Sequence, residues 1–149
     1  MAEISIYTFK RGISKDTNFS VPSSIEHWGI HVKYEGNTPI RMFYHADKTS
    51  LTDNSTYYMP SEEPWNPLSN KDKKVDRRIL IGYSNNLTHE EMNKICFNVS
   101  KDRIFNTITN NCQEWVKSVL VELVKNKNLS QLCLDELKEN KEIIPLLGW

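Results

Sequence analysis

Apolar and polar residues alternate along residues 27–34, a pattern typical of a β-strand with one buried face. Successive side chains of a strand point to opposite faces, so the segment divides into two sets. The set expected to face a core is Trp28, Ile30, Val32 and Tyr34, and the opposite set is His27, Gly29, His31 and Lys33. The face with the histidines is therefore the candidate for function.

Similar patterns predict four more strands. They cover residues 4–9, 40–46, 55–59 and 78–83, where alternation or β-branched and aromatic residues favour extended backbone. The turn residues Gly36 and Asn37 predict a hairpin, which would place strand 40–46 beside strand 27–34.

Helical periodicity replaces alternation in the second half of the chain. We expect helices from Thr88 to Ser100, from Cys112 to about Lys125, and from Ser130 to about Asn140. Thr88 and Glu91 have the spacing of a capping box. The apolar stripe of the middle helix consists of Trp115, Val116, Val119, Leu120, Leu123 and Val124.

Strands followed by helices indicate an α+β fold, with a mostly antiparallel sheet of about five strands and about three helices packed on one side. A chain of 149 residues with 38% hydrophobic content can bury one core and is too short for two ordinary domains. Residues 1–149 are therefore expected to form a single domain.

Residues 60–76 contain Pro60, Pro64 and Pro67 together with Trp65, and predict a long loop. Such a loop is either a lid or a surface segment. Trp65 would either close over a substrate or pin the loop to the core.

Charge and targeting patterns narrow the classes of function. The 19 basic and 19 acidic residues cancel, so nothing in the net charge favours nucleic acid as a partner. The first residues lack the apolar core of a signal peptide, and residues 143–149 fall far short of the ~20 apolar residues of a membrane span. With three cysteines and no secretion signal, we expect a reducing, cytoplasmic compartment. The oligomeric state is left open.

Cys112 is the candidate nucleophile. Asn111 is a favourable N-cap and Glu114 can complete a capping box, which makes Cys112 the first helical residue. The positive end of the helix dipole lowers the pKa of a thiol there, and the free backbone N–H groups can stabilise an oxyanion. The alternative is a small buried residue, which is how we interpret Cys96 and Cys133.

The histidines supply the candidate base. His27 and His31 lie roughly 13 Å apart on a strand at about 3.3 Å per residue, so only one of them can reach a given sulfur. His45 on the neighbouring strand could orient that base. His89, just after the Thr88 cap, is interpreted as a solvated residue at a helix start.

Two short segments resemble a known family. His27-Trp28-Gly29-Ile30 and Asn110-Asn111-Cys112-Gln113-Glu114-Trp115-Val116, with a later strand histidine between them, are similar to the circularly permuted papain-like (NlpC-type) cysteine hydrolases and acyltransferases, in particular the lecithin:retinol acyltransferase-like branch. In that group a strand histidine precedes an Asn-Cys pair that starts a long helix. Here Gln113-Glu114-Trp115 stands where the family often has Glu-His-Phe.

The resemblance implies that Cys112 is the nucleophile, His27 the general base and His45 the third polar residue. The implied reaction is acyl transfer through a thioester on Cys112, from an amide, ester or thioester to water or another acceptor. Trp28, Trp65 and Asn111 are the candidate substrate-binding residues. The expected partner is a peptide, protein or lipid acyl substrate, and we expect no cofactor or metal.

Three other interpretations stay open. The chain could be a catalytically inactive relative that serves as a binding module, or a structural or interaction protein in which Cys112 is only a buried residue. A zinc site formed by His27, His45 and Cys112 is the weaker third possibility, because no short-range ligand pair accompanies it.

Overall fold

The computed structural model describes residues 1–9, 27–48, 58–64, 75–101 and 112–140. They form strands and then helices in chain order. The strands are β1 (Ala2–Phe9), β2 (His27–Tyr34), β3 (Ile40–Lys48), β4 (Tyr58–Pro64) and β5 (Val75–Ser84), and the helices are α1 (His89–Ser100), α2 (Cys112–Lys125) and α3 (Gln131–Glu139).

The strands form one sheet in the order β4-β3-β2-β1-β5, with each neighbouring pair antiparallel. The turn at residues 35–39 joins β2 and β3 as a hairpin, and Gly29 lies opposite His45. On the other side of β2, Phe9 of β1 lies opposite His27. The predicted hairpin is therefore confirmed.

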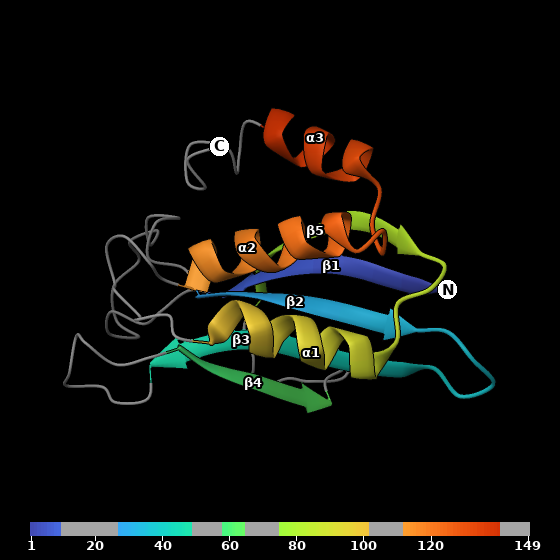
Figure 1. Ribbon diagram of the computed structural model, residues 1–149, viewed down its shortest axis with the longest axis horizontal. Coiled ribbons are helices and arrows are strands. Elements are labelled where there is room, and N and C mark those ends of the chain that lie inside the picture. The colour runs from blue at the N-terminus through green and yellow to red at the C-terminus, as the bar shows by residue number, and fades with distance from the viewer. Residues whose placement is uncertain (10–26, 49–57, 65–74, 102–111, 141–149) are drawn as a thin grey trace.

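The helices α1 and α2 lie over one face of the sheet, as Figure 1 shows, and α3 packs against α2 and β5. An α+β fold with an antiparallel sheet and three helices is thus confirmed among the described residues. None of the described helices is both long and apolar enough to cross a membrane.

Among the described residues, most buried apolar side chains gather between the sheet and the helices, in what we call the helix-side core. The sheet contributes Ile4, Ile6, Trp28, Ile30, Val32 and Tyr44, and α2 contributes Trp115, Val119 and Leu123. A second, smaller cluster on the other sheet face contains Tyr7 and Phe43 with Phe9 against them. We call this other face the histidine face, because His27, His31 and His45 share it with these rings.

Local sequence explains where the helices begin and how two of them join. Thr88 caps α1 by accepting a hydrogen bond from the Glu91 amide, and Ser130 caps α3. At the end of α1, the buried Ser100 hydroxyl donates to the Cys96 carbonyl and accepts from the Trp115 indole at 2.8 Å. This bond ties the last turn of α1 to the first turn of α2.

The fourth strand corrects the sequence-based prediction. We expected a strand over residues 55–59 and a loop over 60–76, but β4 runs from Tyr58 to Pro64. Proline lacks a backbone N–H and is tolerated mainly on edge strands. Because β4 is an edge of the sheet, Pro60 and Pro64 fit within it. Trp65 lies outside the described residues.

Candidate functional site

The structure brings two of the predicted catalytic residues together on the histidine face. His27 is the first residue of β2, and His45 lies on the adjacent β3. Their rings are perpendicular, with centroids 5.0 Å apart, and His27 Nε2 lies 3.1 Å from His45 Nδ1. Both side chains are half-buried. This hydrogen bond is the arrangement expected if one imidazole orients the other.

Aromatic rings flank this imidazole pair. Phe43 stacks on His45 with centroids 5.2 Å apart and an interplanar angle of 26°. Phe9 meets Phe43 edge-on and lies 6.4 Å from His27. Sequence reasoning missed both rings, although Phe43 stands two residues before His45 and the strand alternation already assigns the two residues to one face.

Cys112 is the first residue of α2, as predicted, and its side chain belongs to the helix-side core with an exposed fraction of 3%. The alternation of β2 places His27 on the opposite sheet face. However, β2 and α2 pack together and begin at the same end of the sheet, where His27 and Cys112 are their first residues (Figure 1).

The candidate substrate-binding residues have different outcomes. Trp28 is completely buried in the helix-side core, so its side chain forms no wall of an open site. This corrects its assignment to substrate binding. Its indole nitrogen has no hydrogen-bond partner among the described residues. Asn111 and Trp65 lie outside the described residues, and so does the expected capping of α2 by Asn111.

The other histidine of β2 lies deep in the histidine face. His31 is 1% exposed, and its ring meets the Tyr7 ring edge-on at 5.2 Å. Burial raises the pKa of Tyr7 above its ordinary value of 10.0. The Arg78 guanidinium, 5.9 Å from the centre of the Tyr7 ring, acts in the opposite direction and is smaller in effect.

His89 does not have the role that the sequence indicated. We expected a solvated residue at a helix start, but His89 Nδ1 lies 2.6 Å from the Tyr44 hydroxyl. The Tyr44 hydroxyl also lies 2.6 Å from that of Tyr34. These two consecutive hydrogen bonds, from Tyr34 through Tyr44 to His89, connect the start of α1 to the sheet. Sequence periodicity gave no signal for it, because the three residues come from three different elements.

The remaining cysteines occupy packed positions. Cys96 is 4% exposed in the helix-side core, as predicted. Cys133 on α3 is half-buried and packs beside β5 at Gly82, where an added Cβ would lie 2.6 Å from the Cys133 sulfur. All three cysteines are free thiols.

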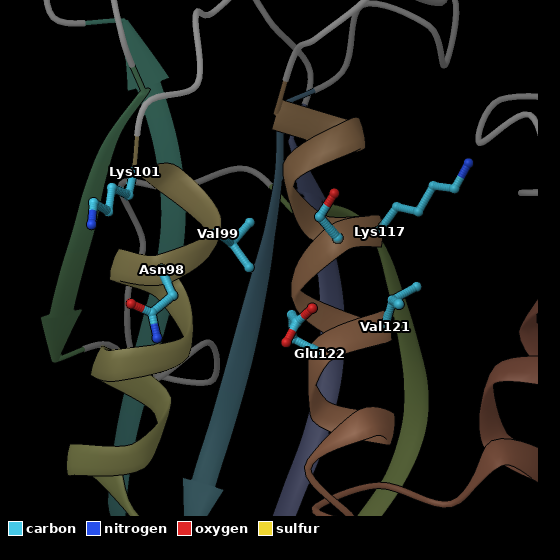
Figure 2. A pocket seen from close by; sticks show the side chains of 7 residues that line it. Asn98, Val99, Lys101, Lys117, Val121 and Glu122 are labelled. Carbon is cyan, nitrogen blue, oxygen red and sulfur yellow. The ribbon is translucent and has the colours of Figure 1, made fainter.

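The described residues contain no group of three or more His, Cys, Asp or Glu side chains placed to hold a metal ion. They do form a groove of about 340 Å³ between α1 and α2, shown in Figure 2. Its lining residues are Asn98, Val99, Lys101, Lys117, Ser118, Val121 and Glu122. None of the predicted site residues lines this groove, so it is separate from the imidazole pair.

Comparison of the chain with protein-family models, with curated proteins and with solved structures gave no match. The case for a function therefore depends on the site residues themselves.

Proposed function

We propose that this protein is a cysteine-dependent hydrolase or acyltransferase with a circularly permuted papain-like (NlpC-type) fold, in which Cys112 is the nucleophile and His27 the general base. The observation that carries the proposal is the hydrogen bond between His27 Nε2 and His45 Nδ1. A catalytic imidazole base needs a second group that fixes its tautomer. The sequence analysis predicted that His45 has this role for His27.

The proposed role of His27 as base assigns the donor of this hydrogen bond to His27 and the proton-accepting role to its other ring nitrogen. A hydrogen bond between two imidazoles needs one N–H donor and one lone-pair acceptor. When His27 donates through Nε2 to His45 Nδ1, its own Nδ1 carries the lone pair and can accept a proton. After it accepts that proton, His27 still donates to His45. The neutral His45 ring thus supports both the free base and the imidazolium.

The position of Cys112 supplies the second half of the reaction. The first backbone N–H groups of a helix have no intrahelical acceptor, so the start of α2 can receive developing negative charge. In the proposed reaction the Cys112 proton passes to His27 Nδ1, the thiolate attacks an acyl carbon, and the leaving group takes the proton from His27. Water or an acceptor amine or hydroxyl then releases the acyl group from the thioester.

The proposed substrate is a peptide, protein or lipid acyl compound whose scissile bond is an amide, ester or thioester. Such a carbonyl has to approach the end of the sheet at which β2 and α2 both begin. Three free thiols fit the reducing, cytoplasmic compartment that the sequence favours.

Trapping of the acyl-enzyme tests this function. The native protein is mixed with a panel of activated esters, thioesters and peptide amides, and the mass of the intact protein is followed over time. We expect one acyl group on Cys112, mapped by peptide analysis, and a rate that falls by roughly 100-fold or more in His27→Gln. Cys133→Ser is the matched control, because it removes a thiol away from the sheet end and should leave acylation unchanged.

A second candidate function has one specific observation in its favour. Cys112 is only 3% exposed, as expected for a packed residue in an inactive papain-like domain that acts as a binding module. In that case no acyl adduct forms on Cys112 with any member of the panel, and His27→Gln behaves like the unaltered protein.

A further inference from the structure

We propose that Phe43 is a positioning residue for the imidazole pair, and that Gly29 is the residue that gives its ring the necessary space. The inference rests on the proposed function, since it assigns Phe43 a role in preparing His45 to orient His27. The Phe43 ring has no reactive group of its own.

The contacts of Phe43 restrict its ring to one place. Phe43 is 1% exposed on the histidine face, and Phe9 meets it edge-on with centroids 5.5 Å apart and an interplanar angle of 85°. The face of the Phe43 ring stacks on the His45 ring, with an interplanar angle of 26°. Because the neighbouring side chains pack closely around it, the Phe43 ring has little freedom to move.

Gly29 explains how the Phe43 ring reaches this position. Gly29 lies between His45 on β3 and Tyr7 on β1 in the sheet register. An added Cβ on Gly29 would lie 2.2, 2.5 and 2.9 Å from three atoms of the Phe43 ring. The ring therefore lies across the space above Gly29.

Stacking on His45 controls the hydrogen bond through the plane of the imidazole. The outer torsion of a histidine side chain is broad, so an unsupported ring rotates freely over a wide range. The Phe43 face limits His45 to one plane, with either Nδ1 or a carbon toward His27. The hydrogen bond between His27 Nε2 and His45 Nδ1 then selects the orientation that turns Nδ1 toward His27. Without the Phe43 ring, only the hydrogen bond to His27 restricts the rotation of the His45 ring.

Imidazole nitrogen NMR tests the proposal at the two histidine rings themselves, and alkylation of Cys112 serves as a separate second readout. In uniformly ¹⁵N-labelled protein, long-range ¹H–¹⁵N correlations show which nitrogen of His27 and His45 carries the proton. We expect one fixed tautomer for each ring in the unaltered protein. In Phe43→Leu, and separately in Gly29→Ala, the His45 signals should shift toward the average of both tautomers. Native Cys112 alkylation should slow roughly tenfold in both variants.

Ile30→Val is the matched control, because Ile30 is buried on the same strand but faces the helix-side core. It should lower stability and leave the imidazole signals unchanged. If the His45 tautomer stays fixed in Phe43→Leu, the positioning role is wrong, whether or not Gly29→Ala folds. If the signals change as expected but Cys112 is unreactive in the unaltered protein, Phe43 does position the pair and the proposed enzymatic function fails.

Discussion

At the scale of single residues, strand alternation carried much of the predictive power. It assigned His27 and Trp28 to opposite faces, and the hairpin at Gly36 brought His45 beside His27, as the structure shows. Alternation gives the face of a side chain but not the direction of its ring. For this reason the stack of Phe43 on His45 could not be predicted.

Tyr7 gives a prediction about pH at this scale. Burial raises its pKa, so the folded protein holds the neutral phenol at pH values where an unfolded chain ionises it. The associated stability is present below pH 10.0 and is lost as the pH rises through the higher folded-state pKa. Between about pH 8 and about pH 10.5, urea unfolding should therefore show a smaller loss of stability in Tyr7→Phe than in the unaltered protein. An equal loss in the two proteins would contradict the assignment.

At the scale of elements, the helices were predicted well because their signals are local. The periodic apolar residues after Cys112 predicted the bounds of α2. The polar residues Thr88 and Ser130 marked the starts of α1 and α3. The edge strand β4 was misplaced because its prolines indicate a loop when only the sequence is considered. The pairing of an edge strand depends on distant residues, which local patterns do not reveal.

The joint between α1 and α2 gives a prediction for this scale. Ser100→Ala removes the acceptor of the buried Trp115 indole and should lower the free energy of unfolding by about 1–3 kcal/mol. Trp115→Phe removes the donor. Urea unfolding of both single variants and the double variant gives the coupling energy of the pair. We expect the double variant to lose less stability than the sum of the two single losses, and simple additivity would show that the bond contributes nothing.

At the scale of the whole molecule, the sheet separates two environments. The helix-side core contains Cys112, and the histidine face contains His27 and His45. The proposed function requires Cys112 and His27 to act together at the end of the sheet where β2 and α2 begin. The sequence could identify the residue types and their elements, because Asn-Cys at a helix start and His-Trp-Gly on a strand are local patterns. The distance between Cys112 and His27 depends on packing across the sheet, which no local pattern reveals.

The most direct test of this account is the pH dependence of Cys112 alkylation in the native protein. Limiting iodoacetamide is applied from about pH 4 to about pH 9, and each cysteine is followed by peptide mass spectrometry in the unaltered protein and in His27→Ala. Cys96 and Cys133 serve as internal references, since one is in the core and the other is half-buried.

We expect Cys112 to react faster than both references, and at a pH well below that of an ordinary thiol with a pKa of about 8.5. We also expect His27→Ala to abolish that advantage. If Cys112 is no more reactive than Cys96 and Cys133, or reacts only after unfolding, the account of Cys112 and His27 as a catalytic pair is contradicted.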